Sequence, residues 1–229
     1  MLSHIASVLF VLLLLVGVPM LSHATARSSQ IRQVPRLSLY VSAVLSQWLL
    51  AGLGLLVTLW TSRDLLAPMF RFVSLRMTLL WAGALAVFAL AGLGTGLILE
   101  RRGWWPAESE LVYLLMPETR REKLWSVLVL APTAAFCEEF LYRGYLLASL
   151  GAWFHSLTWS WGVSSVAFGL AHVYQGWSGM LRAAVLGALL AYPVVSFGSL
   201  YPSMLAHGLI DAFALAWLGP RLLRSNRVV

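Results

Sequence analysis

The amino-acid sequence predicts an all-α, polytopic membrane protein of about seven transmembrane helices that encloses an intramembrane polar site. Hydrophobic residues make up 60% of the 229 residues and charged residues only 11%, and the mean hydropathy is +0.81. A soluble domain carries about 25% charged residues, so this composition excludes a soluble fold. Carboxylates and histidines nevertheless occur within the later apolar runs, where an ionised group is costly unless it is paired or wetted.

The first apolar run covers residues 5–21 and admits two interpretations. Residues 24–26 read Ala-Thr-Ala, which resembles a signal-peptidase site. Signal peptides carry basic residues before the apolar run, however, and here the arginines follow it, at Arg27, Arg32 and Arg36. The positive-inside rule therefore favours a retained helix with its N-terminus outside, while a cleaved signal stays open.

Two further apolar runs cover residues 39–60 and 77–99. The second contains Gly-Leu-Gly-Thr-Gly at 92–96, a spacing of small residues that permits close helix packing in membranes. A polar connection follows at 100–123, and within it 111–116 is apolar enough for a short amphipathic helix on the membrane surface. These patterns predict two spans that an interfacial loop joins to the rest of the chain.

The next helix begins at a recognisable cap. Thr119, with Glu122 three residues later, matches a helix N-cap and its capping-box partner. A helix should therefore start near Arg120 and carry Glu138 and Glu139 into the membrane. Four apolar runs remain, at 124–148, 157–173, 180–197 and 203–218.

The arginines in the connecting segments orient these spans. With the loop at 27–36 inside, six further crossings bring Arg221, Arg224 and Arg227 inside as well, as the positive-inside rule requires. The arginines between 63 and 76 then lie outside, which counts against this topology. The net charge of +7 arises from these segments and does not indicate nucleic-acid binding.

A pair of adjacent glutamates is the first part of the polar site. Glu139 and Arg143 are four residues apart and share one helix face. A bidentate pair of this kind allows both groups to be buried, so we expect a structural clamp. Glu138 is rotated by one residue and is expected to be the working carboxylate. The alternative is that all three form a charge cluster at a membrane surface.

Two histidines and an aspartate complete the set. His207 and Asp211 share a helix face, and His172 lies in an earlier run. Together with Glu138 these groups suit hydrolysis, in which Glu138 takes a proton from water. His172 would help to hold the water, and His207 would donate a hydrogen bond to a developing oxyanion. The same four side chains are also candidate ligands of a zinc ion.

Three motifs carry a family resemblance. They are Glu-Glu-x-x-x-Arg at 138–143, Phe-x-x-x-His at 168–172 and His-x-x-x-Asp at 207–211. In this order and spacing they resemble the CPBP family of intramembrane endopeptidases, which includes the CAAX prenyl proteases and the bacterial Abi-type proteins. The preceding Leu-Met-Pro-Glu-Thr-Arg-Arg-Glu at 115–122 is similar to bacterial members. The resemblance covers residues 115–213.

The resemblance implies an all-helical fold whose site opens to a cavity in the membrane, and peptide-bond hydrolysis near the membrane end of a substrate. It implies that Glu138, His172 and His207 are catalytic. The family often has Asn where this chain has Asp211, and an ionised Asp cannot donate to an oxyanion. Asp211 is therefore expected to hold the His207 ring, to be protonated or to bind a metal. We favour a glutamate-dependent reaction without a cofactor, with zinc as the open alternative.

The chain is expected to have three parts. Residues 1–110 form N-terminal transmembrane helices and an interfacial loop, 111–219 form a CPBP-like catalytic helical core, and 220–229 form a basic tail. The expected partners are the lipid bilayer and a membrane-anchored or C-terminal-tail protein substrate, in a bacterial inner (plasma) membrane. Alternative functions are a proton-coupled transporter and a non-proteolytic membrane scaffold or immunity protein that uses the same buried polar cluster. The absence of inverted repeats argues against a transporter.

Overall fold

The computed structural model describes residues 2–218 except 62, 66–68 and 108. Within this part of the chain the regular secondary structure is helical, without strands and with one isolated antiparallel bridge between Phe70 and Ser199. The all-α prediction is confirmed. The basic tail predicted at 220–229 lies outside the described residues.

The α-helices, in chain order, are α1 (Leu2–Leu12), α2 (Val18–Arg27), α3 (Arg36–Thr61), α5 (Leu75–Arg101), α6 (Glu110–Leu115), α7 (Arg120–Trp125), α8 (Ala131–Glu138), α9 (Leu147–Phe154), α10 (Leu157–Ala171), α11 (Gly176–Phe197) and α12 (Tyr201–Phe213). In the described part of the chain, π-helical segments continue or join them at Leu13–Gly17 (η1), Ser126–Leu130 (η4), Glu139–Leu146 (η5) and Ala214–Leu218 (η7). Short 3₁₀ segments lie at Ser29–Gln33, Arg63–Leu65 and Val173–Gln175.

Among the described residues, five helical stretches are long and apolar enough to cross a membrane: Leu2–Arg27, Arg36–Thr61, Leu75–Arg101, Arg120–Phe154 and Val173–Phe197. The chain is an integral membrane protein, but the predicted number of about seven spans is not confirmed. The run predicted at 203–218 forms α12 and η7, which together are not among these five stretches. The run predicted at 157–173 forms a helix that is too short, because α10 has 15 residues. At 1.5 Å per residue α10 reaches only about 22 Å, whereas the hydrocarbon core is about 30 Å thick.

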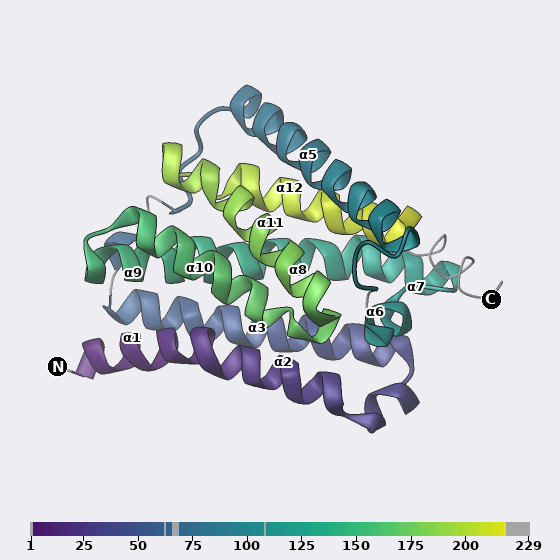
Figure 1. The fold of residues 1–229 in the computed structure, drawn as a ribbon. Helices are drawn as coiled ribbons and strands as arrows, with labels where there is room; N and C mark the ends of the chain where they lie inside the picture. The colour runs from purple at the N-terminus through teal and green to yellow at the C-terminus, as the bar shows by residue number, and fades with distance from the viewer. Residues whose placement is uncertain (1, 62, 66–68, 108, 219–229) are drawn as a thin grey trace.

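The helices are arranged in layers around α8 (Figure 1). α1 packs on α3, α3 packs on α8, and α8 packs on α12, which carries α5 on its far side. α10 and α11 form a closely packed pair. Glu138, at the end of α8, therefore lies between layers that come from both halves of the sequence.

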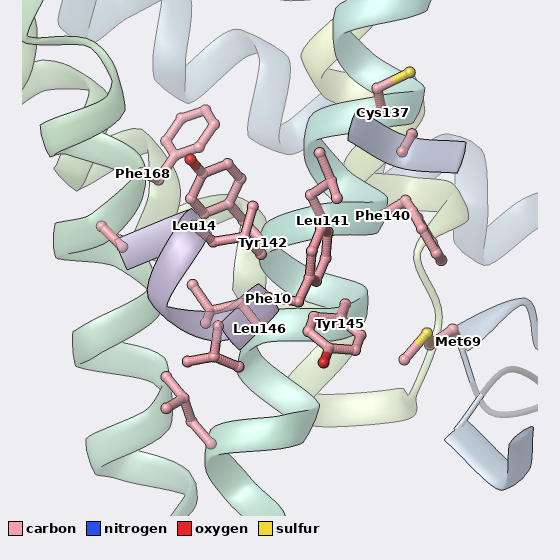
Figure 2. Packing of buried hydrophobic residues seen from close by; sticks show 14 of the residues in the cluster. Phe10, Leu14, Met69, Cys137, Phe140, Leu141, Tyr142, Tyr145, Leu146 and Phe168 are labelled. Carbon is pink, nitrogen blue, oxygen red and sulfur yellow. The ribbon is translucent and has the colours of Figure 1, made fainter. Parts of the chain in front are cut away.

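The buried core joins the first helix to the centre of the bundle (Figure 2). The Phe10 ring meets the Tyr145 ring edge-on, with their centroids 5.0 Å apart. Ser7 Oγ lies 2.9 Å from the Tyr145 hydroxyl oxygen, and Leu14 and Leu141 are buried in the same cluster. The first helix is thus part of the folded core.

The long helix Arg120–Phe154 starts as predicted. Thr119 Oγ1 accepts a hydrogen bond from the Glu122 backbone N–H, and the Glu122 carboxylate accepts one from the Thr119 N–H, which completes the capping box. The helix then widens into π-helical turns at η4 and η5. Pro132, the second residue of α8, has no N–H to offer the preceding turn, which accounts for the first widening. The second begins at Glu139, and such turns are frequent at functional sites.

Gly169 permits the close approach of α10 and α11. A Cβ atom at this position would lie 2.7 Å from the Ala184 Cβ and 2.8 Å from the Met180 carbonyl oxygen, so only glycine fits without a shift. The helix-packing role predicted for the glycines at 92–96 is wrong for Gly92 and Gly94. Neither has a neighbouring atom within 4 Å of where a Cβ would lie, because this stretch of α5 borders a cavity.

Candidate active site

The predicted site residues lie on one cavity of about 560 Å³. Its walls come from α3, α5, α6, α11, α12 and the long helix that contains α8, and most of the lining side chains are apolar. Glu138, His172, His207 and Asp211 all line this cavity. Residues that are far apart in the sequence therefore face the same space in the fold.

Glu138 presents one carboxylate oxygen to both histidines. Its Oε2 lies 3.8 Å from His172 Nε2 and 3.9 Å from His207 Nε2. These separations are too long for direct hydrogen bonds but suit contacts bridged by water. Oε2 is buried and receives no hydrogen bond from the described residues, whereas Oε1 accepts one of 2.7 Å from the Gln47 side-chain amide.

Each histidine has one ring nitrogen engaged in a short hydrogen bond. His172 Nδ1 donates to the Phe168 carbonyl oxygen at 2.7 Å. His207 Nδ1 donates to Glu139 Oε1, also at 2.7 Å. A carbonyl or carboxylate oxygen only accepts, so the shared proton lies on Nδ1 in each case. The Nε2 atoms of both rings are left for water or substrate.

Glu139 and Arg143 support His207 from the interior of the protein. Arg143 Nη1 lies 3.0 Å from Glu139 Oε1, and both side chains are inaccessible to solvent. Within the described residues the ion pair is a single contact and not the predicted bidentate pair, and Glu139 Oε2 has no hydrogen-bond partner. The Arg143 guanidinium group lies over the Phe168 ring, 4.0 Å from its centre. Glu139 and Arg143 are buried inside the protein. The depth of the cluster relative to the membrane stays a prediction.

Asp211 lies beside the outer nitrogen of His207, with Oδ2 3.5 Å from Nε2. This position agrees with a role in holding the ring. A metal centre is less well matched, since no group of three or more His, Cys, Asp or Glu side chains in the described part of the chain is arranged to hold an ion. Zinc stays an alternative that a metal analysis can test.

The structure adds Gln47 to the site, a residue that the motifs do not include. It lies on α3 within the run predicted at 39–60, where a polar side chain at membrane depth is itself an indication of function. The sequence places His172 within a span, but in the structure it lies one residue beyond the end of α10. The chain then turns at Gly176, whose φ of +83° suits glycine, and enters α11.

The fold and the site define a class of integral membrane protein with a carboxylate–histidine cluster on an internal cavity. Residues 120–213 match the family model of the type II CAAX prenyl endopeptidases, described as Rce1-like. The match includes all three motifs and confirms the predicted resemblance to this protease family. It spans less than half of the chain, and Gln47 lies outside it. No curated protein and no solved structure matches the chain.

Proposed function

We propose that this protein is an intramembrane endopeptidase that uses a water molecule activated by Glu138. One observation carries the proposal: on the wall of an apolar cavity, Glu138 Oε2 faces the Nε2 atoms of His172 and His207 at 3.8 and 3.9 Å. A water molecule bridges a gap of this size with two hydrogen bonds of about 2.8 Å. The match to Rce1-like endopeptidases supports the same class of reaction.

The hydrogen bonds suggest how the first step proceeds. Glu138 Oε2 accepts one proton of the water, and His172 Nε2 accepts a hydrogen bond from the other. The water oxygen attacks the carbonyl carbon of the scissile peptide bond, and the carbonyl oxygen becomes an oxyanion. The C–N bond then breaks, and Glu138 returns its proton to the leaving amine.

His207 is the group that would stabilise the oxyanion. Because its Nδ1–H is donated to Glu139, its Nε2 donates only when the ring carries both protons. Glu138, Glu139 and Asp211 lie around the ring and offset that charge. Asp211 would act through its charge from 3.5 Å and leave the Nε2–H group to the oxyanion, so the chain can have Asp where the family often has Asn.

The apolar cavity suits a substrate whose residues beside the scissile bond lie in the membrane. We therefore propose a protein with a membrane anchor or an apolar C-terminal tail, and a prenylated CAAX protein is the substrate that the family description names. The proposed location is a bacterial inner membrane.

A cleavage assay tests the proposal. Purified protein in liposomes is given a farnesylated CAAX peptide and peptides with apolar C-terminal tails, and mass spectrometry follows the products. We expect the wild type to cut near the membrane end of a peptide and Glu138→Gln to cut none, since glutamine keeps the shape but accepts no proton. Thermal unfolding in detergent checks that the variant is folded. Equal cleavage by the wild type and by Glu138→Gln would show that Glu138 is not the general base. Proton uptake into the liposomes without cleavage would favour a transporter.

A further inference from the structure

We propose that Gln47 is a positioning residue for Glu138, an inference that rests on the proposed endopeptidase function. Gln47 lies on α3, in the N-terminal part of the chain and outside the segment that matches the family. Its side-chain Nε2 donates a hydrogen bond of 2.7 Å to Glu138 Oε1. This short distance is typical of an N–H group that faces a charged carboxylate. The catalytic core is therefore completed by a helix that precedes it in the sequence.

The contact determines which oxygen of Glu138 is free to act. A carboxylate only accepts hydrogen bonds, so the amide must present its N–H group to Oε1. Oε2 is then left without a partner among the described residues, and Oε2 is the oxygen that faces His172 and His207. A proton taken from water arrives on Oε2, so the Gln47 hydrogen bond persists throughout the reaction.

A second set of contacts holds α3 against α8 independently of the site. Trp48 Nε1 donates to Thr133 Oγ1 at 3.3 Å, and the Trp48 ring stacks on Phe136 with centroids 5.4 Å apart. Neither contact touches Glu138, so the helix pair does not depend on Gln47 for its docking. An amide on an apolar helix is costly at membrane depth, and in this structure its donated hydrogen bond goes to Glu138.

Kinetics with a matched control test the inference. Gln47→Met removes the amide at similar length, and Thr133→Val removes a hydrogen bond between the same two helices without changing the site. With the farnesylated CAAX peptide, we expect Gln47→Met to lower kcat about ten- to a hundredfold at unchanged KM, the range for a hydrogen bond to a charged group. Thr133→Val should keep a kcat near that of the wild type. Equal losses of kcat in Gln47→Met and Thr133→Val, or a rise of KM alone, would overturn the inference.

A measurement without substrate separates this inference from the proposed function. The infrared bands of the Glu138 carboxylate are identified as those present in the spectrum of the wild type and absent from that of Glu138→Gln. They should shift in Gln47→Met and stay in place in Thr133→Val, whether or not any peptide is cleaved. Unshifted bands in Gln47→Met would overturn the inference. Shifted bands in a protein that cleaves no peptide would support the contact while the proposed function fails.

Discussion

At the scale of single residues, each buried charge depends on a specific neighbour. Glu139 receives contacts from Arg143 and His207, and Glu138 receives one from Gln47. Removing a charge from water carries a large desolvation penalty, which only well-placed partners offset. Substitutions in this cluster should therefore act mainly through the partner that is left behind.

Arg143→Ala is expected to destabilise the protein by about 3–5 kcal/mol, because Glu139 would remain buried without its cation. Thermal unfolding in detergent measures the loss, and cleavage activity should fall with it. The double variant Glu139→Leu, Arg143→Met should regain part of the stability, since neither charge is then buried, but not the activity. An unchanged unfolding temperature in Arg143→Ala would show that the ion pair contributes nothing.

Asp211→Asn is expected to keep activity within about tenfold of the wild type. Asparagine can still accept a hydrogen bond from His207, and Glu138 and Glu139 stay beside the ring to offset its charge, so only the charge of Asp211 is lost. The rate of peptide cleavage is measured for Asp211→Asn and for the wild type. An inactive but folded Asp211→Asn protein would instead indicate that the negative charge itself is required, as it would be for a metal ligand.

The sequence indicates most of this cluster because helical spacing is a local property. Four-residue spacing places Glu139 beside Arg143 and Asp211 beside His207, and both contacts are present. The Gln47 contact joins α3 to α8 and follows from how the helices pack, which spacing along the chain does not encode. The engagement of Glu139 with His207 is missed for the same reason.

At the scale of elements, α10 and α11 meet most closely at Gly169. We expect Gly169→Leu to destabilise the protein by about 1–3 kcal/mol or more, because the new side chain collides with Ala184 and with the α11 backbone. Gly162→Leu on the same helix is the matched control, since nothing lies within 4 Å of where its Cβ would be. The two unfolding temperatures are then compared. Equal temperatures would contradict the packing described for this helix pair.

Helix starts are more predictable than helix shapes. The capping box at Thr119 depends on four consecutive residues, 119–122, and the helix begins where the sequence predicts. Pro132 accounts for the π-helical turns at η4, whereas the turns at η5 and the early end of α10 at Ala171 match no local signal in the sequence. Hydropathy alone counts α10 as a span because it registers apolar composition and not the length of the helix in the fold.

At the scale of the whole molecule, the site draws on both halves of the chain. The segment that matches the protease family carries Glu138, His172 and His207, while α3 carries Gln47 and the first helix packs into the same core. The cavity extends along α5 and α6 as well, so the N-terminal part forms much of the wall that a substrate would contact.

The central claim is that Glu138 activates a water molecule held between it and the histidines. A high-resolution crystal structure of the wild-type protein, with anomalous data at the zinc edge, tests this claim most directly. We predict a water molecule about 2.7–3.2 Å from Glu138 Oε2 and His172 Nε2, and no anomalous peak. An anomalous peak about 2.0–2.2 Å from these atoms would contradict the claim and make the protein a metalloprotease.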